Sequence, residues 1–118
     1  MVLSVDIRHW LDEQGELPAD RPALRRKALR VAQLIEAGAL LEPGEHREAL
    51  VACARRVLGK PCTGLLWVAK LADDRLHACC PQCGGDELYV SGWQDTRWAR
   101  GPMAPQLDPM AAQLHSIH

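Results

Sequence analysis

The chain has 118 residues, of which 47% are hydrophobic and 25% charged, and its formal net charge is −1. This length and composition are typical of one soluble globular domain. The charge near zero gives no overall attraction to nucleic acid, and no apolar run approaches the roughly 20 residues of a membrane span, so we expect no membrane partner.

Three helices are predicted within residues 4–58, because apolar residues recur there at steps of three and four. Ser4 can cap the first helix, and Gly15 suits its C-terminal stop. The second helix is predicted to begin near Pro22, a residue favoured in a first helical turn, and to end at Gly38.

The third predicted helix ends before Gly59, which is followed closely by a proline. Acidic residues occupy its first turn, whereas Arg55 and Arg56 lie near its last turn, and this order suits the helix dipole. Leu50 and Cys53 belong to its apolar face. The first half of the chain is therefore predicted to be helical.

The second half changes to patterns typical of strands. A hairpin and a third strand are predicted within residues 64–93, around a polar turn and a glycine turn. Residues 101–118 contain three prolines and no strong period, which predicts an extended or disordered tail. The sequence thus predicts a single α+β domain over residues 1–100, with about three helices packed on a small antiparallel sheet of about three strands.

Five cysteines are many for a chain of this length, and their number is odd. A secreted disulfide scaffold usually has an even number of cysteines and an export signal. Here Asp6 and Arg8 stand where an export signal needs an apolar run, so we expect a cytoplasmic protein. In that reducing compartment, clustered cysteines bind metal or perform redox chemistry more often than they form disulfides.

The segment from Cys80 to Cys83, followed by two glycines, resembles one knuckle of a zinc ribbon. Two intervening residues let a tight turn bring both thiolates to one tetrahedral ion, and the glycine tolerates the backbone that this turn needs. If the hairpin turns at residues 73–74, Trp67 faces Cys80 and Cys62 lies near the knuckle.

Cys53 can reach the same end of the sheet, because the chain can turn back after Gly59. We therefore predict a structural zinc ion bound by four cysteines: Cys53, Cys62, Cys80 and Cys83. His77 and Cys79 are the alternatives for the fourth ligand, since a cysteine on a helix is often only a small buried apolar residue. A thioredoxin-like redox pair fits less well, because a helix should follow that motif.

Two other features suggest alternative functions. Four cations of the second predicted helix are candidates for contacting the phosphates of a nucleic acid: Arg25, Arg26, Lys27 and Arg30. A solvated helix face is the simpler explanation for them. Trp93 and Trp98 are candidates for a ligand groove or partner surface, but in a chain without phenylalanine they favour burial.

The sequence contains no G-x-S-x-G, P-loop, H-E-x-x-H or dinucleotide-binding motif, which argues against an enzyme. A closed four-cysteine site also points to structure rather than catalysis. We therefore predict a non-enzymatic, metal-stabilised binding or adaptor protein that engages another protein. The alternatives are a nucleic-acid-binding regulator that uses the Arg21–Arg30 helix, and a small-ligand binder or enzyme with its site near Trp93 and Trp98.

The segments CTGLLWV, CCPQCGGDELYVSGW and WQDTRWARGPMAP together look like those of a group of small bacterial proteins. The resemblance covers roughly residues 24–105 and rests on the C-x-x-C knuckle and the GWQDT-x-W segment. It implies a bacterial cytoplasmic origin and one compact domain, and it carries no activity to transfer.

Overall fold

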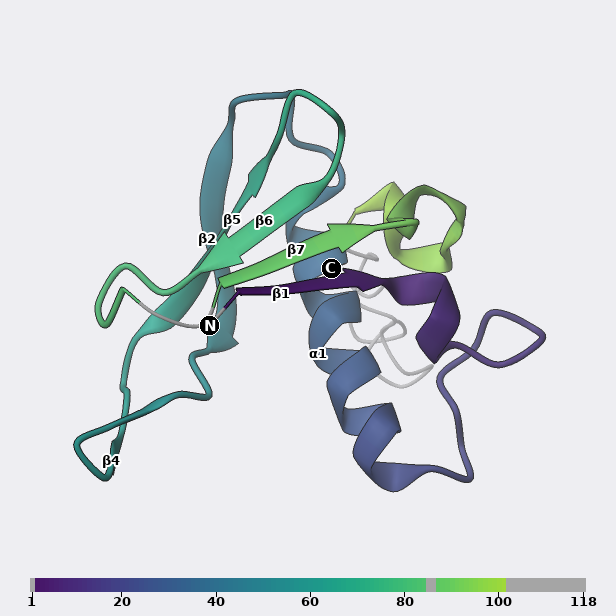
Figure 1. The fold of residues 1–118 in the computed structure, drawn as a ribbon. Coiled ribbons are helices and arrows are strands. Elements are labelled where there is room, and N and C mark those ends of the chain that lie inside the picture. Colours follow the sequence, from purple (N-terminus) through teal and green to yellow (C-terminus); the bar gives the residue numbers. More distant parts are fainter. Residues whose placement is uncertain (1, 85–86, 102–118) are drawn as a thin grey trace, which may run out of the picture.

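The computed structural model describes residues 2–84 and 87–101 of the chain (Figure 1). Within these residues it has one α-helix, a mixed five-stranded sheet and a separate two-stranded sheet. The prediction of about three helices on about three antiparallel strands is therefore wrong. Two of the three segments predicted to be helical form strands and short 3-10 turns instead.

In chain order the elements are β1 (Val2–Asp6), the 3-10 turn η1 (Ile7–Trp10), α1 (Pro22–Gly38), β2 (His46–Ala52), β3 (Arg56–Val57), β4 (Lys60–Pro61), β5 (Leu65–Lys70), β6 (Leu76–Cys79), β7 (Glu87–Ser91) and the 3-10 turns η2 (Trp93–Asp95) and η3 (Arg97–Arg100). The large sheet has the strand order β1-β7-β6-β5-β2. β1 runs parallel to β7, and the other neighbours are antiparallel. β3 and β4 form the small sheet.

The first predicted helix is β1 followed by η1. Val5 is buried while its neighbour Ser4 is exposed, as expected for a strand with one covered face. The apolar spacing fits a helix equally well, and the deciding partner is β7, which lies near the other end of the chain and leaves no local signal. The η1 turn begins at Asp6, whose carboxylate accepts the backbone N–H of Arg8 at 3.0 Å.

The third predicted helix is β2 and the hairpin of β3 and β4. β2 pairs antiparallel with β5, and Val51 and Cys53 are buried at alternate positions. Apolar residues in this short segment fit both the helical and the strand period, so the pattern alone does not separate them. Gly59 ends no helix: it is the second residue of the turn between β3 and β4, with a φ of 78°.

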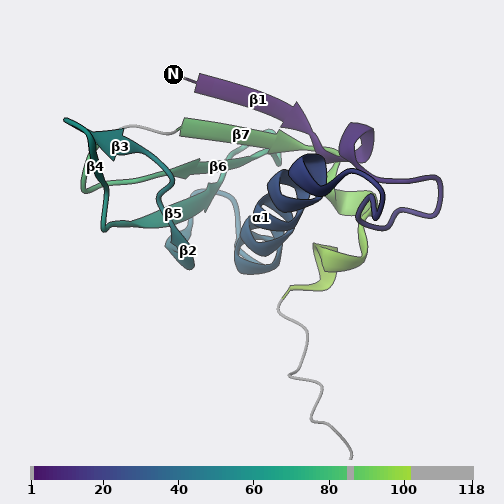
Figure 2. The ribbon, with the colours of Figure 1, turned by 90° about the horizontal axis from the view of Figure 1, so that it is seen from below.

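The helix α1 lies across one face of the large sheet (Figures 1 and 2). Its buried residues recur at helical spacing and face the sheet: Ala28, Val31, Ala32, Leu34, Ile35 and Gly38. Gly38 lets the helix approach β5 closely, because a Cβ there would lie 2.9 Å from Cγ2 of Val68. Alternate residues of β5 and β6 point to this covered face.

The buried residues divide into two clusters. The tryptophan cluster joins α1 to β1, β7, η2 and η3, and it contains Val5, Ile7, Ala28, Val31, Ala32, Ile35, Ala39, Val68, Leu76, Val90, Trp93 and Trp98. The cysteine cluster is smaller and contains Leu34, Val51, Cys53, Leu66, Ala78 and Cys80. It lies where β2 and β6 end, whereas the two tryptophans follow the opposite end of β7.

No helix among the described residues is long and apolar enough to cross a membrane. Gly101, the last described residue, is buried against Leu40. The tail predicted over residues 101–118 otherwise lies outside the described residues.

Candidate metal centre

Four of the five cysteines meet at one end of the large sheet. Cys53 follows β2, Cys62 follows β4, and Cys80 and Cys83 belong to the turn after β6. Their sulfur atoms all lie within 4.8 Å of one another. The sulfur of Cys53 is 3.8 Å from that of Cys83, and the sulfur of Cys62 is 3.7 Å from that of Cys80. These separations match the roughly 3.8 Å between sulfurs in a tetrahedron with metal–sulfur bonds of about 2.3 Å.

Backbone hydrogen bonds fix the four positions before any ion is considered. The N–H of Cys53 donates to the carbonyl of Gly64, and the N–H of Cys62 donates to the carbonyl of Arg55, both at 2.9 Å. The N–H of Gly84 donates to the carbonyl of Cys80 at 2.9 Å, which closes the knuckle turn. The structure therefore brings together the four predicted ligands and could hold one metal ion there.

Gly64 is required by the packing of this centre. A Cβ at position 64 would lie 2.8 Å from the sulfur of Cys80 and 2.9 Å from Cβ of Gln82, both closer than real contacts allow. The N–H of Gly64 also donates to the sulfur of Cys62 at 3.4 Å. In the sequence, Gly64 is only a glycine after Cys-Thr. Its role becomes visible once β5 and β6 are paired, because this pairing brings position 64 against Cys80.

The hairpin register differs by one residue from the predicted one. Trp67 pairs with Cys79 rather than with Cys80, because the connection between β5 and β6 is longer than the predicted two-residue turn. The backbone N–H of Leu71 donates to the carbonyl of Arg75, and Asp74 adopts a φ of 73°. Cys62 still lies beside the knuckle, since its placement does not depend on this single step.

Burial, backbone N–H groups and neighbouring thiols shift the pKa of three of these thiols: Cys53, Cys62 and Cys80. Burial raises the pKa of the Cys53 thiol from 9.0 to about 12, and the neighbouring thiols add to the rise. Burial also opposes ionisation of Cys80, but the backbone N–H groups of Cys83 and Gln82 outweigh it and lower its pKa to about 7. A backbone N–H favours the Cys62 thiolate, yet burial and two adjacent thiols leave its pKa raised. The thiolate forms of Cys53 and Cys62 are therefore disfavoured unless a nearby cation compensates their charge.

Among the residues that the structure describes, the donor set consists of sulfur alone. Cys53 and Cys80 are buried, while Cys62 and Cys83 are half-buried, and no described histidine or carboxylate belongs to the group. Soft thiolates at tetrahedral separations fill the coordination sphere of a d¹⁰ or similar ion and leave no position for water or substrate. The arrangement suits a structural ion better than a catalytic one.

The two alternative ligands point to the other face of the sheet. Cys79 pairs with Trp67, and His77 pairs with Tyr89 and stacks on its ring with centroids 4.6 Å apart. Because neighbouring residues of a strand alternate between faces, Cys79 points away from Cys80 and the four-sulfur cluster. Neither His77 nor Cys79 is part of the four-sulfur cluster.

The predicted nucleic-acid contacts lie on the first half of α1. Arg25, Arg26 and Lys27 are exposed, and Arg30 is half-buried. The first turn of the helix contains no acid, and its N-cap residue Arg21 makes no side-chain capping bond. Cations at this end are disfavoured by the helix dipole, so they do not stabilise the helix.

Trp93 and Trp98 belong to the core rather than to the surface. They are 4% and 3% exposed, respectively. The indole N–H of Trp93 donates to the carbonyl of Asp74 at 2.8 Å, and the ammonium of Lys70 lies 4.9 Å from the Trp93 ring centroid. The structure thus places both rings where they cover α1 and the sheet.

The β3–β4 hairpin is not among the elements that the sequence predicts. The pattern predicts the end of a helix there, whereas Leu58 and Gly59 form a two-residue turn between two strands. A signal was present in the chain: a glycine between two short cationic segments, with cysteines on both sides, is a pattern that also fits a hairpin rising from a metal knuckle.

Comparison with known proteins finds no match: no family model, no curated protein and no solved structure is similar to this chain. The resemblance to small bacterial proteins therefore stays a prediction.

Proposed function

We propose that the four-cysteine cluster binds one zinc ion and that this ion is structural. The observation that carries the proposal is the approach of all four sulfurs within 4.8 Å of one another. Zinc is favoured because a closed tetrahedral set of four thiolates is its usual structural site. Iron competes with zinc for the same thiolate ligands, and metal analysis of the purified chain distinguishes the two ions.

We further propose that the protein is a non-enzymatic binding or adaptor module that engages another protein. A closed metal site supplies rigidity and leaves no open coordination position for chemistry. Leu50 and Leu58 are 78% and 98% exposed, so their side chains bury little area in the fold. Exposed apolar side chains of this size suit contact with a partner protein. Cysteines that must stay reduced to bind metal suit a cytoplasmic setting.

The metal assignment is tested by purifying the chain from cells supplied with both zinc and iron. We expect one equivalent of zinc per chain and, in X-ray absorption, four sulfur neighbours at about 2.3 Å. Cys53→Ser and Cys83→Ser should lose the metal, while Cys79→Ser, the matched control outside the cluster, should keep it. Stoichiometric iron would contradict zinc, and a metal-free folded chain would contradict the centre itself.

Nucleic-acid binding is the second candidate, because Arg25, Arg26 and Lys27 are exposed together on α1. If it holds, affinity for a labelled 20-mer should fall with salt, with a slope of about −0.9 per phosphate contacted on duplex DNA. Replacing the three cations with glutamine should reduce that slope. Absence of binding at low salt would exclude this candidate and leave the protein-binding module.

A further inference from the structure

Two sulfur–sulfur contacts in the four-cysteine cluster join different parts of the fold. The sulfur of Cys53, after β2, lies 3.8 Å from that of Cys83 in the knuckle turn. The sulfur of Cys62, after β4, lies 3.7 Å from that of Cys80, after β6. The sulfurs of a disulfide are about 2.05 Å apart, so each pair has to close by roughly 1.7 Å to form a bond. Each of the four sulfurs thus already contacts a possible bonding partner.

Gly64 lies against both sulfurs of the second pair. Its N–H donates to the sulfur of Cys62 at 3.4 Å. A Cβ at this position would lie 2.8 Å from the sulfur of Cys80, so the sulfur occupies the space that the missing side chain leaves. One glycine therefore holds the Cys62 and Cys80 sulfurs side by side. This contact favours their pairing over a bond between Cys80 and Cys83 within the knuckle.

Each pair combines an accessible cysteine with a protected one. Cys62 and Cys83 are half-buried, whereas Cys53 and Cys80 are buried. A small oxidant can therefore reach one cysteine of each pair, and the second cysteine is in contact with the first. Peroxide converts an accessible thiolate to a sulfenic acid, which condenses with a neighbouring thiolate to a disulfide. The cluster thus contains two sets of an attacked cysteine and a resolving cysteine.

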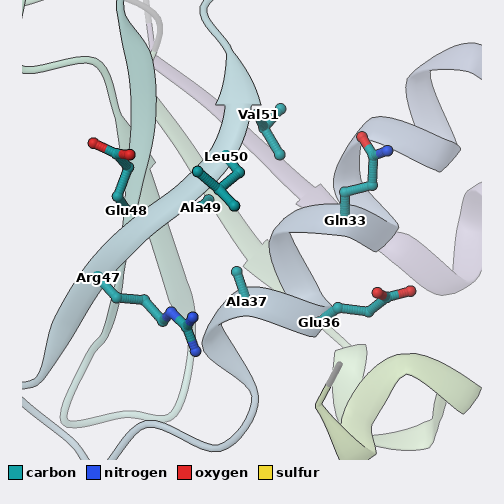
Figure 3. A pocket seen from close by; sticks show the side chains of 8 residues that line it. All are labelled: Gln33, Glu36, Ala37, Arg47, Glu48, Ala49, Leu50 and Val51. Carbon is teal, nitrogen blue, oxygen red and sulfur yellow. The ribbon is translucent and has the colours of Figure 1, made fainter. Parts of the chain in front are cut away.

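The segments that carry these cysteines can make the small shift that bond formation needs. All four cysteines lie outside the strands. β2 also loses its regular register just before Cys53, between Glu48 and Ala52. Leu50 and Val51 belong to this irregular stretch, beside α1 (Figure 3). Because the extra residues of a bulge have no partner in the ladder, a small shift at Cys53 need not disturb the regular pairing earlier in β2.

We propose that the cluster responds to peroxide by exchanging its zinc ion for two disulfides, Cys53–Cys83 and Cys62–Cys80, while this end of the sheet stays closed. The inference rests on the proposed function, because it concerns the same four ligands. The two disulfides join the segments after β2 and β4 to the knuckle after β6, as the ion does. The oxidised chain therefore keeps the local structure that the reduced, metal-free chain loses.

Peroxide alone balances the oxidation. The thiolate sulfur of Cys62 or Cys83 forms a bond to one peroxide oxygen as the O–O bond breaks, and hydroxide leaves. The thiolate of its contacting partner, Cys80 or Cys53, then attacks the sulfenic sulfur; the S–S bond forms and a second hydroxide leaves. Four thiolates and two peroxide molecules thus yield two disulfides and four hydroxide ions. No thiolate of the cluster then remains to hold the ion.

The first test adds two equivalents of hydrogen peroxide to the zinc-loaded full chain, beside an indicator dye that takes no zinc from the untreated chain. We expect one equivalent of zinc to be released and one of five thiols to stay free, because Cys79 lies outside the cluster. Cys79→Ser should release the same zinc and keep no free thiol. Dithiothreitol followed by zinc should restore the starting state. Zinc that stays bound, or leaves with all five thiols still free, would overturn the inference.

Tryptic mapping of the oxidised chain tests the pairing. Trypsin cuts between Cys53 and Cys62 and again before the knuckle, so three separate fragments carry the four ligands. We expect the knuckle fragment to be joined to both of the others. Fragmentation of the knuckle peptide between its two ligands should show Cys80 bonded to Cys62. A direct bond between the Cys53 and Cys62 fragments, or Cys80 bonded to Cys53, would contradict the proposed pairs.

Hydrogen exchange tests whether the disulfides replace the ion. Amides in residues 53–64 should stay protected in the oxidised, zinc-free chain, whereas chelation of the reduced chain should remove their protection. Loss of this protection on oxidation would mean that the disulfides do not close the end of the sheet, and the inference would fail. A zinc-loaded chain that fails any of these tests contradicts only the redox exchange. A reduced chain that folds without metal contradicts the proposed function.

Discussion

The two clusters of the core differ in what closes them. The tryptophan cluster has twelve buried residues, and Trp93 and Trp98 cover it with large rings. The cysteine cluster has six buried residues, and two of them are cysteines whose partners Cys62 and Cys83 are only half-buried. At one end of the sheet the core is therefore covered by large apolar side chains, whereas at the other end its boundary is formed by the four cysteines.

This difference shows how a small domain can be completed in two ways. The helix covers one region with aliphatic and aromatic area, and burial alone stabilises that region. At the other end the chain carries a small cluster and an exposed hairpin, where too little area is buried to hold the backbone. The proposed ion would replace that missing area, as expected for short chains.

The largest expected effect comes from removing one ligand. Cys83→Ser should lose the metal and destabilise the fold by several kcal/mol, because structural zinc binding is worth on the order of 10 kcal/mol at neutral pH. Cys79→Ser should retain both metal and stability. Denaturant unfolding with parallel metal analysis measures this, and equal stability of the two variants would show that the ion does not hold the cysteine end.

A cavity made in the tryptophan cluster should lower the stability of the fold without changing its affinity for metal. Ile35 is fully buried in the tryptophan cluster, so Ile35→Ala should cost about 2–5 kcal/mol. Zinc affinity should not change, because the residue belongs to the other cluster. A competition titration with a chelating dye checks the affinity, and a parallel loss of zinc would show that the two ends are not independent.

Two glycine variants sharpen the same comparison. Gly64→Ala should weaken zinc binding by about 10–100-fold, since its Cβ would crowd the sulfur of Cys80 at 2.8 Å. Gly38→Ala brings a Cβ to 2.9 Å from Val68 and should lower the melting temperature while leaving zinc affinity unchanged. If Gly38→Ala weakened zinc binding and Gly64→Ala did not, the two clusters would not have these separate roles.

The smallest expected effect concerns Asp6 at the start of η1. Hydrogen bonds from the Arg8 side chain and backbone lower the Asp6 pKa from 3.8 to about 2. Because the folded-state pKa is depressed, its contribution is present above about pH 4 and is lost as the pH falls through 2. Asp6→Asn should cost at most about 1 kcal/mol at pH 7, and the difference from the wild type should vanish near pH 2.

The clustering of the four cysteines was predictable from the sequence, because the spacing of Cys80 and Cys83 is typical of a metal knuckle. Cys80 and Cys83 define a knuckle by their separation, and a hairpin places Cys62 beside them whichever of two registers is chosen. Cys53 lies beside the other three cysteines although its segment is predicted to be a helix. Cys53 lies near Cys62 because the chain reverses direction at Gly59. A hairpin reverses the chain there just as the end of a helix would.

The fold was less predictable because its decisive contacts are distant in sequence. β1 pairs with β7, and β2 pairs with β5, so neither strand is defined by its own residues. Short apolar segments such as residues 46–52 fit two periods, and tertiary pairing decides between them. Segments with one clear period, α1 and the β5–β6 hairpin, lie where the pattern placed them.

Hydrogen exchange of the zinc-loaded and chelator-treated protein tests the central claim most directly. Chelation should remove protection from amides in residues 53–64 and 76–83, where Cys53 and Cys62 donate to Gly64 and Arg55, while α1 and β7 stay protected. Unchanged protection around the cysteines after metal removal, or uniform loss across the whole chain, would contradict an ion that closes only this end of the sheet.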